Sequence, residues 1–337
     1  MNEEMAFTMT FSRKKLKTNP ISSLLSSGNP AIEYYTRRDL LDENTGREED
    51  LWELPAALRI LRKQMDDGFW KYPGKISGDL RSREDYNQVE TYRVFGELIC
   101  KYGLNKNHPQ IRKAAEFFFS CQTLEGDFRG IYGNQYTTTY SPAIMELLIK
   151  AGYGNDHRVK KGFQWLFSMT QDDGGWVIPF RTSGMKIKEA LLASAPELPD
   201  RSRPFSHLVT GMVLRALAAH PEYLKSEVTR KTAKILAIRL FQADKYPDRR
   251  GKEYWERVSY PFWFTDIISA MDSLSIIGLS RENPYIKEGL DFLIHKQNDE
   301  GLFDLKIVRG SDKDLKYWIC LAICRILKRY GFKLENK

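Results

Sequence analysis

The sequence predicts an all-α protein in which two concentric layers of helices form a closed ring. Two observations support this prediction. A short turn containing Gln, Gly and an aromatic residue recurs along the chain, and amphipathic runs before these turns alternate with runs that are apolar on most sides. A helix with one charged face covers a surface, whereas a helix that is apolar nearly all round is buried, so the chain alternates outer and inner helices.

The recurring turn has four clear copies. They read RKQMDDGFW around Gln64, SCQTLEGDF around Gln122, MTQDDGGW around Gln171 and HKQNDEGLF around Gln297. The successive spacings are 58, 49 and 126 residues, so the last gap has room for one more copy, and a weaker one lies there with Gln242 in the Gln position. Each clear turn follows a run with a charged side, such as KKGFQWLF before Gln171, which predicts an outer helix.

Runs of a second type lie between the turns and predict the inner helices. They share an apolar circumference and a final Gly or His, and they cover residues 90–103, 141–152, 207–220, 265–278 and 318–331. A further run of the inner type, PAIEYYTRRDLLDEN from Pro30, precedes the first outer helix and begins the ring. Asn29 before it, and Asn283 before the last outer helix, are typical residues for a helix start.

We expect residues 29–337 to form a single domain, with an inserted segment at residues 181–205 that interrupts the repeats. This segment contains a short helical stretch followed by prolines, and insertions of this length are often lids or binding loops. Residues 1–28 are rich in Ser, Thr and Asn, and we expect them to be poorly ordered. Their basic cluster at residues 13–17 is compatible with peripheral contact to acidic lipid headgroups at most.

Composition excludes several classes of protein. The formal net charge of the 337-residue chain is +8, but 52 basic residues are interleaved with 44 acidic ones, which argues against a nucleic-acid partner. We find neither a run near the roughly 18 apolar residues of a membrane span nor a secretory signal. The four cysteines form no C-x-x-C pair, as is typical of reduced cysteines. We therefore expect a cytoplasmic protein, whose oligomeric state the sequence leaves open.

The Gln, Gly and aromatic turns, repeated from Pro30 onward, resemble the repeat shared by squalene and oxidosqualene cyclases and the β subunits of protein prenyltransferases. The resemblance implies an α/α toroid, in which inner helices surround a cavity lined with aromatic residues. It also implies that the Gln and the aromatic residue of each turn tie one outer helix to its neighbour. Members of this superfamily perform different reactions and some bind without catalysing, so function has to be inferred from the site.

The acidic pairs in the turns have a structural explanation. Asp66-Asp67 and Asp172-Asp173 occupy the same place, directly after or near the Gln of their turn. Asp followed by Gly forms turns, because the short side chain bonds to the local backbone and Gly accepts a positive φ. Neither pair continues into a D-D-x-x-D pattern. We therefore interpret these acids as turn residues and not as a metal-binding pair.

Two motifs of the resembled superfamily are missing from the sequence. The D-x-D-D motif with which a squalene-hopene-type cyclase protonates its substrate does not occur, and Asp266 stands alone in the nearest match, FWFTDIISAMD. The D-x-C that supplies two zinc ligands in a protein prenyltransferase is replaced by Asp266-Ile267-Ile268. Cys320 and Cys324 share a helix face, which we interpret as packed core. We therefore expect neither a metal nor another cofactor.

The N-terminal ends of the inner helices are the expected place for chemistry, because free N–H groups and partial positive charge gather there. Aligning the inner runs on their last residues places Glu90, His207 and Asp266 at this end, and we expect these three to supply acid-base groups. Each also has an ordinary explanation as a cap or first-turn residue. We expect Thr139 and Tyr140 to contact the substrate at the same end.

Aromatic and basic residues complete the predicted substrate site. Tyr260, Trp263 and Trp318 lie near the starts of two inner runs, where their faces suit an apolar chain or a carbocation, or simply form core. Arg181 and Arg203 in the inserted segment suit a diphosphate or carboxylate, unless this segment is only a solvated linker.

Three functions are compatible with these residues. The first is an enzyme, either an isomerase, a lyase or a transferase, that transforms an isoprenoid-like or other apolar small molecule in the central cavity. The second is a non-catalytic toroid that binds a lipid or a protein partner. The third is an (α/α) barrel that acts on carbohydrate through two carboxylates, Glu90 and Asp266, although the repeats favour the first superfamily.

Overall fold

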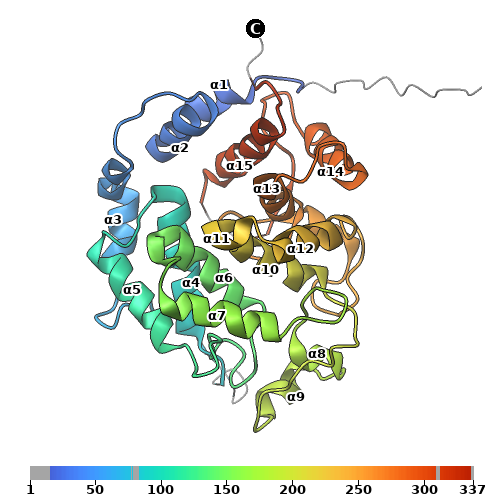
Figure 1. The fold of residues 1–337 in the computed structure, drawn as a ribbon. Helices are drawn as coiled ribbons and strands as arrows, with labels where there is room; N and C mark the ends of the chain where they lie inside the picture. The colour runs from blue at the N-terminus through green and yellow to red at the C-terminus, as the bar shows by residue number, and fades with distance from the viewer. Residues whose placement is uncertain (1–15, 77, 79–82, 309–311, 335–337) are drawn as a thin grey trace, which may run out of the picture.

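The computed structural model describes residues 16–76, 78, 83–308 and 312–334, and it shows an α/α toroid, which confirms the predicted fold class (Figure 1). The inner helices are α2 (Pro30–Tyr35), α4 (Tyr86–Tyr102), α6 (Tyr140–Leu148), α10 (His207–Ala219), α13 (Ile267–Ile277) and α15 (Leu315–Arg329). Each of them contacts the next, and α15 contacts α2. The inner set therefore closes on itself, with the N-terminal helices beside the C-terminal one (Figure 1).

The outer helices cover the inner ring. They are α1 (Pro20–Leu25), α3 (Pro55–Leu61), α5 (Pro109–Ser120), α7 (His157–Ser168), α12 (Glu227–Ala237) and α14 (Pro284–His295). Two of them approach their inner neighbours through glycine: a Cβ at Gly162 would lie 2.8 Å from Sδ of Met145, and one at Gly289 would lie 2.6 Å from Sδ of Met271. Glycine at these crossings leaves room for the methionine side chain of the inner helix.

The glutamine turns at Gln64 and Gln122 each fasten one outer helix to the next. Nε2 of Gln64 donates a hydrogen bond to the carbonyl oxygen of Gln110, in the first turn of α5, at 2.8 Å. Nε2 of Gln122 donates in the same way to the carbonyl of Arg158 in α7, at 2.9 Å. A side-chain amide has two donors and one acceptor, so a single glutamine can bond its own turn and the neighbouring helix together. The turns are therefore joints of the outer layer.

The last glutamine turn closes the outer ring onto the N-terminal segment. Nε2 of Gln297 donates to the carbonyl of Thr18 at 2.9 Å, and Oε1 accepts from the backbone N–H of Lys17 at 2.7 Å. The short helix α1 follows and buries Ile21 and Leu24. This differs from the expectation of a poorly ordered segment through residue 28. The other part of that segment, residues 1–15 with most of the basic cluster, lies outside the described residues.

The inserted segment takes the place of an outer helix after the third turn. Nε2 of Gln171 donates to the carbonyls of Asp200 and Arg203, at 2.8 and 2.9 Å, whereas Gln64 and Gln122 bond to a helix. The segment and its approach contain α8 (Pro179–Thr182) and α9 (Ile187–Leu192), which lie on the outside of the ring (Figure 1). Its position shows it to be a part of the outer layer.

The remaining elements are short connections: η1 (Thr36–Leu40), η2 (Glu48–Glu53), η4 (Ile149–Tyr153), α11 (Pro221–Leu224), η5 (Lys252–Glu256), β1 (Arg257–Val258) and β2 (Lys306–Ile307). The two strands pair in parallel, with Arg257 opposite Lys306 and Val258 opposite Ile307. This pairing fixes the chain just before residues 259–264. Within the described residues, none of the helices combines the length and the hydropathy required to cross a bilayer.

The glycines of the turns have different surroundings. This difference predicts how much stability each position loses when alanine replaces the glycine. Gly68 and Gly174 have φ values of +89° and +88°, but a Cβ at Gly68 would lie 2.3 Å from the carbonyl oxygen of Lys113, whereas nothing lies within 4 Å of one at Gly174. Both alanine variants incur about 1 kcal/mol or more of backbone strain. We expect Gly68→Ala to lose about 2 kcal/mol more, from overpacking against α5. Equal losses of unfolding free energy in urea titrations of the two variants would contradict this prediction.

Candidate functional site

Residues 259–264, with the sequence SYPFWF, cross the centre of the ring and fill part of it. The hydroxyl of Tyr92 in α4 donates to the carbonyl of Phe262 at 3.3 Å, and the hydroxyl of Tyr260 donates to the carbonyl of Cys100 at 3.3 Å. The ring of Tyr260 stacks on Trp318 of α15, with centroids 5.7 Å apart and planes 6° apart. We name residues 259–264 the central segment. It bonds to inner helices on several sides, so the hollow expected from the sequence is narrowed by the chain itself.

A central cavity of about 150 Å³ remains between this segment, α4, α6 and the start of α15. Its aromatic wall is formed by Tyr92, Tyr260, Phe262 and Trp263. The opposite side is charged and consists of Arg93, Glu97, Lys101 and Asp312, of which Lys101 is buried and bonds Asp312 at 2.6 Å. An apolar protein cavity of this volume holds a molecule about the size of benzene. The central cavity is therefore amphipathic, and its volume equals that of a small ring-sized molecule.

A second, polar cavity of about 90 Å³ adjoins the central cavity, with which it shares Leu147 and part of the central segment. Four charged side chains line the polar cavity: Glu146, Lys150, Asp272 and Arg325. Glu146 is shared by two cations, since Lys150 lies 2.6 Å from Oε1 and Arg215 lies 2.9 Å from Oε2. Arg215 also directs its terminal nitrogens at the carbonyls of Trp263 and Phe264, each at 3.5 Å.

Both groups keep their charges, although only Glu146 is buried and the Lys150 side chain is 37% exposed. Burial alone would raise the pKa of the Glu146 carboxyl, but Arg215 and Lys150 lower it below its ordinary value. Burial alone would lower the pKa of the Lys150 ammonium, but the charge of Glu146 raises it above its ordinary value. A buried ion is stable only where such partners offset the loss of water. The centre of the toroid therefore contains a fixed ionic cluster beside its aromatic wall.

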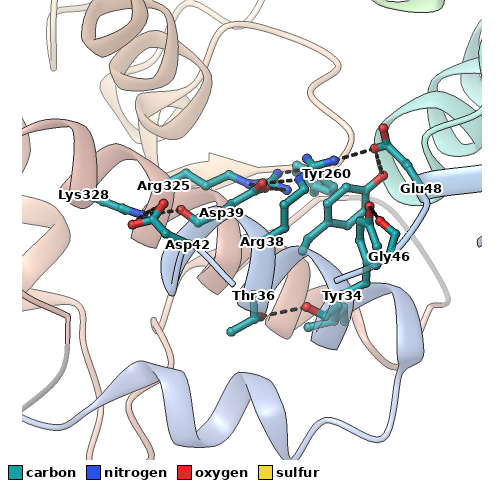
Figure 2. A network of polar contacts seen from close by, with 12 residues as sticks. Tyr34, Thr36, Arg38, Asp39, Asp42, Gly46, Glu48, Tyr260, Arg325 and Lys328 are labelled. Carbon is teal, nitrogen blue, oxygen red and sulfur yellow. Dashed lines mark hydrogen bonds and ion pairs between the residues drawn. The ribbon is translucent and has the colours of Figure 1, made fainter. Parts of the chain in front are cut away.

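The polar cavity opens toward the surface through a charged groove of about 300 Å³. The groove shares Cys100, Lys150, Tyr260 and Arg325 with the polar cavity. Figure 2 shows the network at its edge, where Nε of Arg325 donates to Asp39 at 2.7 Å and NH1 of the same residue approaches the hydroxyl of Tyr260 at 3.4 Å. The charged groove, the polar cavity and the central cavity therefore adjoin one another in this order, from the surface to the centre of the ring.

Asp266 is buried at the start of α13 and is 2% exposed. Its carboxylate accepts a hydrogen bond from the backbone N–H of Ser269 at 2.8 Å and caps the helix. Burial raises the pKa of Asp266 to about 6, although the hydrogen bonds from Ser269 and the charge of Arg215 act to lower it. A pocket of about 10 Å³, bordered by Trp263 and Arg249, adjoins the carboxyl. Trp263 and Ser259 line both this pocket and the central cavity, so the two spaces are neighbours.

His207 lies away from the central cavity. Its ring stacks on Trp255, with centroids 4.7 Å apart, and Nδ1 lies 3.2 Å from Asp244 without the alignment of a hydrogen bond. Burial lowers the pKa of His207 to about 4, against the opposing effect of Asp244. Asp244 accepts hydrogen bonds from Ser206 and the backbone N–H of Leu208, which caps α10. The structure places His207 in a structural contact between α10 and the connection that precedes α13.

Glu90, Thr139 and Tyr140 have different surroundings. Glu90 pairs with Arg93 one turn along α4, at 2.6 Å, and the cavities at the centre are lined by other residues. Thr139 is buried and lies 3.5 Å from the hydroxyl of Tyr132. Tyr140 packs edge-on against Trp263, whose Nε1 donates to the Tyr140 hydroxyl at 3.3 Å. Of the three, Tyr140 supports the aromatic wall, and Glu90 and Asp266 do not line a common cavity.

The two arginines of the inserted segment do not reach the centre. Arg181 forms a bidentate pair with Asp248, at 2.7 Å for both bonds, and a third bond to the carbonyl of Met185 at 3.0 Å. Arg203 is 61% exposed and pairs with Asp200. A bidentate arginine has little remaining capacity for a ligand. Arg181 therefore fastens the inserted segment to the connection before α13, whereas Arg203 pairs within the segment itself.

Sequence analysis missed the charged residues of the inner helices. Glu146 and Lys150 are four residues apart in SPAIMELLIKAG, and Arg215 lies within HLVTGMVLRALAAH. A charge in a run that is otherwise apolar on all sides has to face either a cavity or a buried partner. That signal was present in the sequence, and it would have directed attention to the centre of the ring. Within the described residues, His, Cys, Asp and Glu do not gather in threes that could hold a metal ion.

Comparisons with known proteins relate part of the chain to a family. Residues 79–183 match the squalene-hopene cyclase C-terminal domain. Among solved structures, the chain is similar to a polysaccharide lyase, with a TM-score of 0.43, 13% identity, and coverage of 83% of this chain and 86% of that one. It is also similar to the type II terpene cyclase MstE from Scytonema in complex with geranylgeranyl dihydroxybenzoate, with a TM-score of 0.36, 12% identity, and coverage of 89% and 98%.

The family match covers α4, α5, α6, α7 and the glutamine turns at Gln122 and Gln171. These are the elements that provide Tyr92, Glu146 and Lys150 at the centre of the ring. The toroidal fold, the glutamine turns and this match agree with the resemblance seen in the repeats. The chain is similar to the terpenoid cyclase superfamily of α/α toroids, with a squalene-hopene cyclase-like segment at residues 79–183.

Proposed function

We propose that this protein binds a small, partly apolar molecule of the isoprenoid-like class in its central cavity and transforms it by acid-base chemistry, with Asp266 as the acid. The observation that supports this most strongly is the cavity of about 150 Å³ beside the aromatic wall of Tyr92, Tyr260, Phe262 and Trp263. Aromatic faces bury apolar chains well and attract developing positive charge. Ligand sites are typically concave and apolar with a few placed polar groups.

The size of the cavity limits the ligand. A volume of about 150 Å³ matches a ring-sized molecule, whereas drug-sized ligands occupy roughly 300–1,000 Å³. A longer isoprenoid chain therefore requires the central segment to withdraw from between α4 and α15. The hydrogen bonds from Tyr92 and Tyr260 that hold this segment are 3.3 Å long, at the weak end of the usual range. Displacement of residues 259–264 by the ligand is part of the proposal.

The acidity of Asp266 limits the classes of reaction that it can catalyse. A carboxyl whose pKa is about 6 is poised near neutral pH to give up and take back a proton. Such an acid suits proton transfer at an oxygen or at an activated carbon. It is too weak for an unactivated alkene, which requires a strongly acidic group. The reaction class is therefore an isomerisation or elimination of an activated substrate, after Trp263 turns aside to expose the carboxyl.

A non-catalytic binding toroid is the second candidate, and one observation favours it. Asp266 caps α13 through its bond to Ser269, as an aspartate at a helix start does in many proteins with no catalytic role. In that case the cavity would still bind its ligand, but Asp266 would contribute only to the fold. The Asp266→Asn variant distinguishes the two candidates. An enzyme loses turnover in this variant while ligand binding, measured in parallel, is retained, whereas a binding protein has no turnover to lose.

Shortening Phe262 tests the cavity itself. We expect Phe262→Ala to enlarge the cavity and to raise the affinity for a bulkier isoprenoid alcohol such as farnesol about tenfold relative to wild type. Phe292→Ala is the control, because it makes the same deletion on the outer helix α14. Isothermal titration calorimetry measures both variants. Unchanged affinity in Phe262→Ala, or an equal change in both variants, would place the ligand outside the central cavity.

A further inference from the structure

The polar cavity next to the central cavity has an unusual charge balance. Two cations, Lys150 and Arg325, and two anions, Glu146 and Asp272, line it. The direct ion-pair partners of these four groups outside the cavity are Arg215, Arg329 and Asp39. With those partners included, four cations face three anions. The next pair in the network, Arg38 and Glu48, adds one charge of each sign and leaves the balance unchanged (Figure 2).

The surplus positive charge arises at Glu146, because this one carboxylate is shared by Lys150 and Arg215. Both Glu146 and Arg215 are buried, with side chains 5% and 3% exposed. A buried charge without a full counterion is costly in free energy. Asp266 influences Arg215 through its charge but lies outside this set of direct pairs.

Hydrogen-bond donors are also left over at this cavity. The Lys150 ammonium has three donors, and within the described part of the chain it contacts Glu146, which leaves donors for the cavity space. NH1 of Arg325 has only a long contact of 3.4 Å, to the hydroxyl of Tyr260. Both cations line the volume of about 90 Å³, and each has N–H groups without a short hydrogen bond to the described residues. An acceptor that carries negative charge would satisfy the donors and the charge together.

We propose that the polar cavity binds the carboxylate head of the ligand, between Lys150 and Arg325, while the apolar part of the same ligand lies in the central cavity. This inference rests on the proposed function and narrows the substrate to an apolar carboxylic acid. The two cavities adjoin along Leu147, Tyr260, Pro261 and Phe262, so a single molecule spans them when it passes the central segment.

A carboxylate fits the surplus better than the alternatives. Its single negative charge equals the single positive surplus of the cluster, whereas a diphosphate would leave further negative charge buried. An alcohol would satisfy donors without compensating charge. The charged wall of the central cavity is a weaker competitor for the head, because its two cations, Arg93 and Lys101, already face Glu97 and Asp312.

The test compares three probes that share one hydrocarbon chain: geranic acid, geraniol and geranyl diphosphate. Calorimetric titration of the full chain should show geranic acid binding about tenfold tighter than geraniol, and geranyl diphosphate no tighter than the acid. Lys150→Met should reduce the affinity for geranic acid about tenfold and leave that for geraniol unchanged. Lys328→Met is the matched control, since Lys328 pairs with Asp42 at the outer edge and lines neither cavity.

A second variant, with the opposite expected effect on binding, distinguishes a loss of charge from a folding defect. Asp272→Asn removes a negative charge from the same cavity, so it should strengthen the binding of geranic acid while Lys150→Met weakens it. Equal affinities for the acid and the alcohol, or a loss in Lys328→Met as large as in Lys150→Met, would overturn the inference and leave the proposed function standing. Lys150-dependent binding of the diphosphate above that of the acid would overturn the carboxylate assignment. Binding of none of the three probes would overturn the proposed function together with this inference.

Discussion

Replacing Arg215 with Met is expected to destabilise the protein by about 3 kcal/mol, as breaking a buried ion pair does when one charge stays behind. Arg215 lies 2.9 Å from Glu146, and both side chains are almost fully buried. Methionine retains most of the aliphatic stem, so the change removes the charge and little of the packing. The expected value stands at the low end of the range because Lys150 still pairs with Glu146. Urea titration at neutral pH measures the loss.

A double-mutant cycle separates charge from packing in this prediction. Replacing both partners, Glu146→Leu with Arg215→Met, should be less damaging than the sum of the two single changes by about 1–3 kcal/mol, because no unpaired carboxylate remains from this pair. The control pair is Glu227 and Lys231 on α12, which lie 2.9 Å apart but are 78% and 73% exposed. Lys231→Met should change stability by less than about 0.5 kcal/mol. A similar loss in both lysine and arginine variants would contradict a special role for the central cluster.

The architecture could be predicted because the glutamine turns are local signals that repeat. Gln64 and Gln122 make the same bonds in the structure, each to its own turn and to the next outer helix. A local motif of this kind carries its geometry with it wherever it occurs. The closure of the ring by Gln297 and Thr18 was not predictable in the same way, since the segment around Thr18 resembles none of the outer runs.

The centre of the ring could not be predicted, because its contacts join residues far apart in the sequence. The central segment reads as an aromatic approach to an inner helix, and only the structure shows Tyr260 stacked on Trp318 and Phe262 bonded to Tyr92. Periodicity identifies which side of a helix is buried, but it does not show what lies opposite that side. The connection of residues 238–266 is long enough to reach the centre, and no local pattern specifies that it does so.

The sequence predicted that the candidate site residues lie near helix starts, but it did not predict which side of each helix they occupy. Aligning inner runs on their last residues correctly placed Glu90, His207 and Asp266 near helix starts. A helix start has a side toward the ring centre and a side toward the outer layer, and the alignment did not distinguish them. His207 lies against Trp255 on the outer side, whereas Asp266 lies behind Trp263 on the inner side. The role of Asp266 in acid-base chemistry stays a prediction, and it can be tested.

Replacing Asp266 with Asn is expected to stabilise the protein above pH 6 by up to about 3 kcal/mol. The carboxyl has a pKa of about 6 in the folded chain and an ordinary value of 3.8 in the unfolded chain. Between these two values the folded state holds a proton that the unfolded state has released, so stability falls as pH rises through this window. At 1.36 kcal/mol per pKa unit, the gap amounts to about 3 kcal/mol, fully present as a penalty above about pH 6. Asparagine carries no charge, and it retains the helix cap because its side-chain oxygen also accepts from Ser269.

The measurement is the difference in unfolding free energy between Asp266→Asn and the wild type, from urea titrations at several pH values between 4 and 8. The difference should grow from about 0.5 kcal/mol at pH 4, where about half of the unfolded molecules still hold the proton, to its full value above about pH 6. A constant difference would mean that Asp266 does not titrate in this window. The same variant decides its catalytic role: an enzyme should lose at least about a hundredfold in turnover with affinity for the ligand retained, since general acid catalysis contributes about 10²–10⁴. Retained turnover in a variant that shows the stabilisation would establish that the buried carboxyl is a property of the fold and that the chemistry belongs to another group.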